Sequence, residues 1–348
     1  MVVVELSHGS RRRCRLKFLT VLALVSFSAQ GVLAQQGQTV PATQHPLEAK
    51  TELVKLDVTV LDKQGDFVDG LEQKSFRILD AGVERPVTFF APVTAPADVV
   101  ILLETSPAVY LFQDAHIAAA YSLLGGLAAD DEVALVTYSD VPQSVVPFTT
   151  NRPELMNALG SVQYALGMAS LNLYDSISAV IDGVSRFPGK KALVLLTTGL
   201  DSSSPERWDA LTQKLKRSDV VIFAIGLGQG LGANTVKTKA PKKPSPFSDA
   251  TNDSPILDKA RNALASLSAM SGGRAYFPAS GQDFAPAYRE IAASLRHEYV
   301  LGIVPQHDGK FHALNVEVLD AKGSVPKKKH GEAEYRVSAR EGYMAPQP

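Results

Sequence analysis

The sequence is poor in the residues that carry out most thiol and histidine chemistry. Its 348 residues include one cysteine and seven histidines. The cysteine, Cys14, lies in a segment that we expect to be removed on export, which leaves no disulfide and no thiol nucleophile. No two histidines have a metal-ligand spacing such as His-x-x-x-His, and no Gly-x-Ser-x-Gly elbow is present. These shortages argue against a thiol enzyme, a histidine-based metal centre and an α/β-hydrolase.

The chain also lacks an excess of positive charge. It has 35 basic and 36 acidic side chains, a formal net charge of −1. The first 34 residues carry five of the basic side chains and one acidic one, so the remaining chain has 30 basic and 35 acidic side chains, a net charge of −5. Nucleic-acid binding depends on positive potential. We therefore expect no nucleic-acid partner.

The amino-terminal residues have the three parts of a secretory signal peptide. A basic cluster (Arg11–Lys17) precedes an uncharged apolar run (Phe18–Ser28), and small residues near Ala34 follow. The apolar run is shorter than the ~20 residues that span a bilayer. We expect residues 1–34 to be a signal peptide cleaved near Ala34, which places the protein outside the cell, in the periplasm or at the outer envelope. An uncleaved segment, the one route to a membrane that the sequence offers, remains the alternative.

A polar segment and two β-like segments surround a larger central region. Residues 35–50 are rich in Gln, Pro and Thr, which is typical of a flexible linker. Residues 51–96 contain "LVKLDVTVLD", in which apolar and polar residues alternate as in a half-buried strand. Residues 296–345 contain similar stretches, such as "FHALNVEVLD". Each β segment is short for an independent fold, so we expect the two to pair into one small antiparallel β sandwich.

Residues 97–295 alternate between buried strands and helices. "DVVILLE", "KALVLLTTG" and "VVIFAIGLG" are continuous apolar strands, and helical stretches such as "QDAHIAAAYSLLGGL" separate them. This alternation predicts an α/β domain with a doubly wound, mostly parallel sheet covered on both faces. The domain is inserted in the sandwich or flanked by it. One helix is expected to start with Ser204 as its N-cap, Pro205 at its first helical position and Glu206 in its first turn.

Ligands of a doubly wound sheet bind beyond the carboxyl ends of its strands. Three turns lie there: "ETSPA" (Glu104–Ala108), "GMASLNLYDSI" (Gly167–Ile177) and "TTGLDSSS" (Thr197–Ser204). A glycine-rich stretch also follows a strand at Gly226–Ala233, but prolines soon after it prevent the helix that a dinucleotide motif must open. We expect no small-molecule cofactor there. The long stretch Lys237–Pro255 is a candidate recognition loop at the same edge.

The order of these segments resembles a von Willebrand factor A-type domain. The resemblance is carried by "VVILLE-T-S", "VALVTYSD", "LNLYDSI" and "ALVLLTTGLDSSS" in that order. The flanks, "LDVTVLDKQGDFVDGLEQKSFRILDAG" and "LRHEYVLGIVP", resemble the VWFA-related proteins common in acidobacteria. The resemblance covers nearly all of the chain after the signal segment, and it implies a binding module in place of an enzyme.

That family often carries a metal-ion-dependent adhesion site, in which carboxylates and hydroxyls from the three turns hold a divalent ion. Ser106 matches this pattern, whereas Glu104 stands in place of the first Asp. Ala108, Leu171 and Thr198 stand where a Ser, a Thr and an Asp are expected. Affinity for a divalent ion depends on the number of charged ligands. We therefore expect no metal, or at most a weak Mg²⁺ or Ca²⁺ site on Glu104, Ser106 and Thr198.

The sequence therefore predicts a secreted, non-enzymatic module that binds a protein partner through a rim at the strand ends. The rim is expected to consist of Glu104, Ser106, Ser170, Asn172, Thr198 and Asp201. Three alternatives remain: a metal-dependent adhesion domain with a variant site, a hydrolase that uses Ser202–Ser204, and an envelope protein that only assembles with itself. The hydrolase is the weakest, because no histidine is placed beside those serines as a base.

Overall fold

The computed structural model describes residues 53–92, 95–110, 113–165, 167, 170–227, 255–320, 322–326 and 333–348. The expected signal peptide, the expected linker, the glycine-rich stretch from residue 228 on and residues 237–254 of the expected recognition loop lie outside the described residues. No helix among the described residues is long and apolar enough to cross a membrane.

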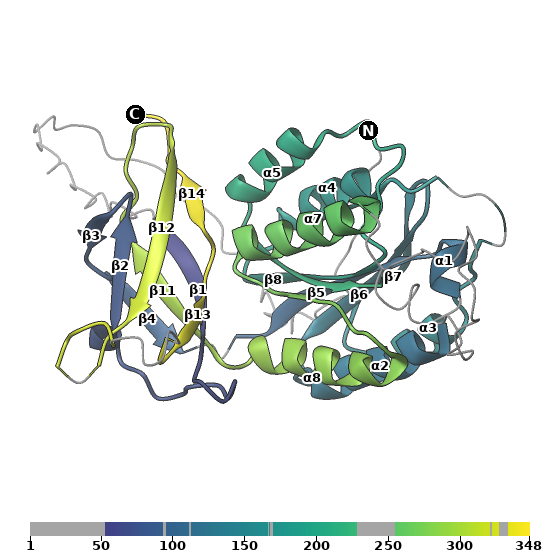
Figure 1. The fold of residues 1–348 in the computed structure, drawn as a ribbon, viewed down its shortest axis with the longest axis horizontal. Coiled ribbons are helices and arrows are strands. Elements are labelled where there is room, and N and C mark those ends of the chain that lie inside the picture. Colours follow the sequence, from purple (N-terminus) through teal and green to yellow (C-terminus); the bar gives the residue numbers. More distant parts are fainter. Residues whose placement is uncertain are drawn as a thin grey trace, which may run out of the picture.

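A six-stranded sheet forms the centre of the larger of two bodies (Figure 1). Its strand order is β10-β9-β8-β5-β6-β7. Every neighbouring pair is parallel except β6 and β7, which a tight turn joins into an antiparallel hairpin. This is the mostly parallel α/β sheet that the apolar strands predict. The strands are β5 (Ala97–Glu104), β6 (Glu132–Tyr138), β7 (Pro142–Thr149), β8 (Lys190–Thr197), β9 (Val220–Gly226) and β10 (Ala275–Tyr276).

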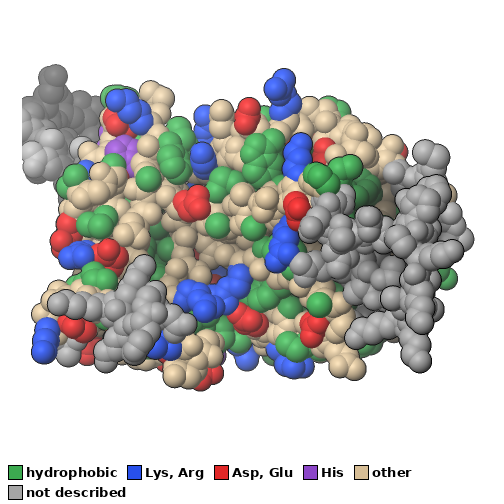
Figure 2. Space-filling view, in the orientation of Figure 1, with side chains coloured by type: hydrophobic (Ala, Val, Ile, Leu, Met, Phe, Trp, Pro, Cys, Tyr) green, Lys and Arg blue, Asp and Glu red, His purple; other side chains and the backbone are tan. Residues whose placement is uncertain are grey.

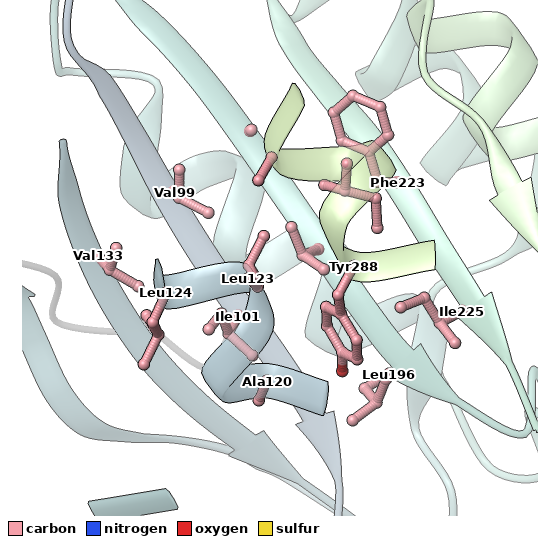
Figure 3. Packing of buried hydrophobic residues seen from close by; sticks show 14 of the residues in the cluster. Val99, Ile101, Ala120, Leu123, Leu124, Val133, Leu196, Phe223, Ile225 and Tyr288 are labelled. Carbon is pink, nitrogen blue, oxygen red and sulfur yellow. The ribbon is translucent and has the colours of Figure 1, made fainter. Parts of the chain in front are cut away.

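Helices cover both faces of this sheet, which explains why its strands are apolar along their whole length. One face packs against α2 (Gln113–Gly126), α3 (Arg152–Gly160) and α8 (Phe284–Ser294). Figure 3 shows part of this layer, in which Leu123 of α2 and Tyr288 of α8 lie over the sheet. The other face packs against α4 (Leu173–Val184), α5 (Trp208–Arg217) and α7 (Pro255–Ser271). A short helix, α1 (Pro107–Tyr110), directly follows β5.

Strands from both ends of the described chain form the smaller body. Two four-stranded antiparallel sheets, of order β13-β1-β11-β4 and β14-β12-β2-β3, enclose a separate apolar core that includes Leu56, Ile78 and Leu301. Each sheet pairs a strand from before the α/β region with a strand from after it: β1 with β11, and β2 with β12. The strands are β1 (Val54–Leu61), β2 (Phe76–Asp80), β3 (Val83–Arg85), β4 (Phe89–Pro92), β11 (Glu298–Ile303), β12 (Phe311–Val318), β13 (Arg336–Ser338) and β14 (Gly342–Met344); the 3₁₀ turns η1 (Gln73–Ser75) and η2 (Gly281–Asp283) lie in connections.

Charged side chains of both signs are interspersed on the face shown in Figure 2. The described surface on this side therefore has no broad field of positive charge, as the acidic composition predicts.

One expected helix start is wrong. The helix after β8 begins at Trp208, with Arg207 at its N-cap, and not after Ser204. The Ser204 hydroxyl instead donates to the Asp201 carboxylate and accepts from the Asp175 main-chain N–H. The Ser204 hydroxyl therefore satisfies an N–H in the first turn of α4 and does not cap the helix that follows β8.

A buried ion pair joins the two bodies. Lys190 at the start of β8 pairs with Glu298 at the start of β11, and their side chains are 6% and 3% exposed. The Lys190 ammonium also donates to the Leu295 carbonyl (2.7 Å). Burial raises the pKa of Glu298 to about 7, although the Lys190 charge opposes that rise. A second connection runs from the Arg340 guanidinium to the Lys216 carbonyl of α5 (2.9 Å).

The raised pKa of Glu298 predicts a specific pH dependence of stability. Between about pH 4.5 and 7 the folded protein holds a proton at Glu298 that the unfolded chain releases, so this group's contribution to the free energy of unfolding falls as the pH rises. The fall is at most about 1.4 kcal/mol per pH unit. Glu298→Gln should remove this component, which urea unfolding at a series of pH values would detect. The exposed Glu84→Gln is the matched control and should leave the slope as in the wild type; an unchanged slope in Glu298→Gln would contradict the assignment.

Candidate functional site at the strand ends

The three turns that the sequence singles out lie together at the carboxyl edge of the central sheet. Glu104 is the last residue of β5, and the parallel register places it opposite Tyr138, the last residue of β6. On the other side β8 pairs in register with β5, so Thr197 and Thr198 follow at the same level. The sheet thus delivers one carboxylate and several hydroxyls to one point.

The Glu104 carboxylate is at the centre of this cluster and is 0% exposed. Its Oε1 accepts a hydrogen bond from the Ser106 hydroxyl (2.5 Å). Its Oε2 accepts from the Thr197 hydroxyl (2.9 Å), the Thr198 main-chain N–H (2.7 Å) and the Thr198 hydroxyl (2.9 Å). The Tyr138 hydroxyl donates to Oε2 as well (3.2 Å) and lies 2.7 Å from the Thr197 hydroxyl. Five donors of the protein thus surround the carboxylate, which compensates for its burial.

Tyr138 acts in this cluster as a neutral donor. Its side chain is buried, and burial raises the pKa of its hydroxyl well above the ordinary value of 10. The negative charge of Glu104 raises that pKa further. The Tyr138 proton therefore stays in place at any physiological pH and remains available to Glu104.

A second set of bonds fastens the third turn to the start of α4. The Asp201 carboxylate accepts from the Tyr174 main-chain N–H (3.0 Å) and from the Ser204 hydroxyl (2.5 Å). The Ser202 hydroxyl accepts from the Leu171 main-chain N–H (2.9 Å). In return, the Asp175 carboxylate accepts from the Glu206 main-chain N–H (2.8 Å). The stretch "DSSSPE" (Asp201–Glu206), which we call the clamp, therefore joins the third turn to the start of α4 by hydrogen bonds.

The six residues of the expected rim lie in two layers. Glu104, Ser106 and Thr198 are buried, at 0%, 3% and 3% exposure, so they lie beneath the surface and position the turns. Ser170 is exposed, and Asn172 and Asp201 are partly exposed, so these three are accessible to a partner. The Asn172 amide donates to the Asp140 carbonyl (2.6 Å), which ties the rim to the β6–β7 turn.

The residues present do not fit a divalent ion of the adhesion-site type. Glu104 is the one carboxylate of the inner layer, and its oxygens already accept from five donors. The next carboxylate, Asp201, is held by the clamp, and Ala108 offers no side-chain oxygen. Within the part of the chain that the structure describes, no group of three His, Cys, Asp or Glu side chains is placed to hold a metal. Mg²⁺ requires near-octahedral oxygen ligation, which this hydrogen-bonded cluster does not offer.

The serines of this edge also lack the partners of a nucleophile. Ser202 and Ser204 are engaged in the clamp, and the Ser203 hydroxyl lies 3.2 Å from that of Ser202. Among the histidines with described side chains, His297 and His312 bond to Asp69 and Asp80 of the smaller body. A general base must lie within hydrogen-bond reach of the proton it takes. No described histidine hydrogen-bonds to these serines.

Sequence reasoning missed Tyr138 and Thr197, which complete the shell of Glu104. A signal for both was available. They are the last residues of strands that neighbour β5, and their hydroxyls would meet the end of β5 in any parallel sheet of that order. The strand order itself could not be derived from local patterns, so the signal could be used only once the order was known.

Comparison with known proteins gives a match over most of the α/β region of the chain. Residues 98–263 match the family model of the von Willebrand factor type A domain. No curated protein matches the sequence.

Several solved structures have a similar fold. A von Willebrand factor type A protein from Catenulispora acidiphila is 13% identical with a TM-score of 0.43, and the match covers 86% of this chain and 64% of that chain. The domain of a type V pili tip protein from Porphyromonas gingivalis is 12% identical with a TM-score of 0.40, covering 58% and 96%. Proximal thread matrix protein 1 of the mussel byssus, with a zinc-occupied adhesion motif, is 13% identical with a TM-score of 0.43, covering 59% and 49%. These matches concern the fold alone.

The Glu104 cluster predicts a large stability loss on truncation. Glu104→Ala should lower the free energy of unfolding by about 3 kcal/mol or more, because it leaves several buried donors without an acceptor. Urea unfolding at neutral pH would measure the loss. Ser202→Ala, which removes a single partly exposed hydroxyl of the clamp, is the control and should cost about 1 kcal/mol. Similar losses for the two variants would contradict the central role of the carboxylate.

Proposed function

We propose that this chain, whose residues 98–263 carry a von Willebrand factor type A domain, is an exported, non-enzymatic module that binds a protein through its strand-end rim without a metal. The observation that carries the proposal is the saturation of the Glu104 carboxylate by five donors of the protein. Export rests on the signal-like composition of residues 1–34.

The structure of the inner layer supports binding in the absence of metal. An adhesion site with a bound cation offers an open coordination position to a carboxylate of its partner. Here the bonds from Ser106 and Thr198 to Glu104 take over the structural task of the ion, which is to hold the first and third turns together. The rim is thereby preorganised, which lowers the entropic cost of binding.

The outer layer supplies the contact surface that such a module needs. Ser170 is exposed at the rim, and the turn after β6 presents Val141, which is 42% exposed. Tyr110 of α1, directly after the first turn, is 45% exposed and contacts Tyr164 edge-on, with ring centroids 6.1 Å apart. Exposed tyrosines beside short polar side chains are typical of protein interfaces. We infer that the partner is a protein that packs on this edge.

Metal independence is tested by thermal unfolding in EDTA and then in millimolar Mg²⁺, Ca²⁺ or Mn²⁺. The wild-type protein should show the same melting temperature in each. The variant Glu104→Asp/Ala108→Ser/Leu171→Thr/Thr198→Asp, which restores the ligand pattern of the adhesion site, is expected to gain stability with metal. A site at 100 times its dissociation constant adds about 2.7 kcal/mol, a shift of several degrees. Such a shift in the wild type would overturn the proposal and favour a metal-dependent adhesion domain.

The rim is tested by two matched substitutions at opposite edges of the sheet. Ser170→Arg places a long cation on the rim, and Ser185→Arg places the same side chain at the other end of α4, where Ser185 is also exposed. Each variant and the wild type are cross-linked to an envelope extract of the source organism in EDTA. The wild type and Ser185→Arg should capture the same protein, and Ser170→Arg should lose at least about 90% of it, a tenfold effect of about 1.4 kcal/mol. Equal capture by all three, or no specific capture by the wild type, would refute a protein-binding rim.

A further inference from the structure

A pocket of about 340 Å³ lies far from the rim, between the two bodies. One side is the outer face of the β13-β1-β11-β4 sheet, with Asp57, Phe89 and Val300. The other side is the amino edge of the central sheet, with Val220 at the start of β9. Arg340, which lies between β13 and β14, also lines the pocket. Its volume falls at the lower end of the range for small-molecule sites, which also form preferentially between domains.

Two of the five charged residues that line this pocket, Asp57 and Arg340, have opposite charges and do not bond to each other. Asp57 lies on β1, and its carboxylate makes no hydrogen bond or ion pair to any residue that the structure describes. The Arg340 guanidinium uses Nε for the Gly342 carbonyl (2.7 Å) and Nη2 for the Lys216 carbonyl (2.9 Å). Its Nη1 makes no hydrogen bond to the described residues. Each charge influences the pKa of the other, yet no ion pair within 4.0 Å joins them.

Burial makes both groups receptive to a ligand of opposite charge. Burial raises the pKa of the Asp57 carboxyl, and the positive charges of Lys190 and Arg340 offset part of that rise. Burial likewise lowers the pKa of Arg340, and the carboxylates of Asp219 and Asp57 oppose this. A cation beside Asp57 and an anion beside Arg340 would each compensate for a charge that has lost water.

The remaining lining of the pocket is mixed. Its other charged members have partners of their own: Lys190 pairs with Glu298, Asp219 pairs with Lys191, and the Lys55 ammonium lies over the Phe89 ring. Its apolar members include Phe89 and Ala91 of β4, Val300 of β11, and Val220 and Val221 of β9. A ligand that satisfies Asp57 and Arg340 therefore has to carry an apolar group as well. The polar groups fix its orientation, and the apolar walls accept the part that prefers to leave water.

We propose that this pocket is a binding site for a free α-amino acid with an apolar side chain. The α-ammonium group pairs with Asp57, the α-carboxylate pairs with the Nη1 side of Arg340, and the side chain packs on Phe89 and Val300. The site is separate from the rim and does not depend on the proposed protein binding. Because its two sides come from different bodies, the bound ligand would also hold the two bodies together.

Calorimetric titration of the full chain with L-leucine and with L-phenylalanine tests the proposal. Saturable binding of at least one of the two is expected. For the amino acid that binds, analogues that lack one charge separate the two contacts: 4-methylpentanoate and 3-methylbutylamine for leucine, 3-phenylpropanoate and 2-phenylethylamine for phenylalanine. Each analogue should bind at least about tenfold more weakly, because a charge-assisted hydrogen bond contributes that much or more.

Two variants localise the site without disturbing the bonds that Arg340 makes to the fold. Asp57→Asn keeps the shape and removes the charge, and Ala91→Trp fills the pocket while leaving its charges in place. Both should weaken binding at least about tenfold at an unchanged melting temperature. Asp114→Asn, on the exposed surface of α2, is the matched control and should bind as the wild type does. No wild-type binding of either amino acid at ten-millimolar concentration, equal binding of the one-charge analogues, or unchanged binding by Asp57→Asn would each overturn the proposal.

Discussion

The hydrogen-bonded carboxylate of Glu104 determines what the strand-end edge of this protein can do. A buried carboxylate is stable only when donors or cations compensate for its lost hydration. Ser106, Tyr138, Thr197 and Thr198 supply those donors, from the turn after β5 and from the ends of β6 and β8. The hydrogen bonds that compensate for the lost hydration of Glu104 also connect three neighbouring strands. They thereby set the positions of the turns that follow these strands. An ion would have to compete with all of these donors, which is why we propose that this edge binds its partner by shape and surface contact.

Buried charges also have compensating partners at the junction between the two bodies. Lys190 and Glu298 are buried together, and the main-chain carbonyl of Leu295 completes the shell of the ammonium. Asp57 and Arg340, close by, are charges without such a complete shell. The contrast distinguishes two buried groups that are partnered within the protein from groups that retain the capacity to bind a ligand.

Much of the fold could be predicted from the sequence, and the reason is the hydrophobic pattern. The continuous apolar strand Ala97–Glu104 requires cover on both faces, and the alternating stretch around Leu56 requires cover on one. The grouping of the three turns follows from the parallel sheet. The saturation of Glu104 could not be predicted, because it depends on strand order and on the reach of Tyr138. Ser204 illustrates a second limit: its hydroxyl fits both a helix N-cap and a turn, and it bonds to the nearby Asp201 carboxylate and to the Asp175 N–H, which is distant in sequence.

The central claim is that protein donors, and no cation, complete the shell of Glu104. The most direct measurement is a crystal structure grown in millimolar Mn²⁺, with anomalous scattering data collected to locate the ion. The account predicts no anomalous peak within coordination distance of the Glu104 oxygens, and hydrogen bonds from Ser106 and Thr198 that remain intact. A manganese ion bound to Glu104, with those hydroxyls turned toward it, would contradict the account and restore the edge as a metal-dependent adhesion site.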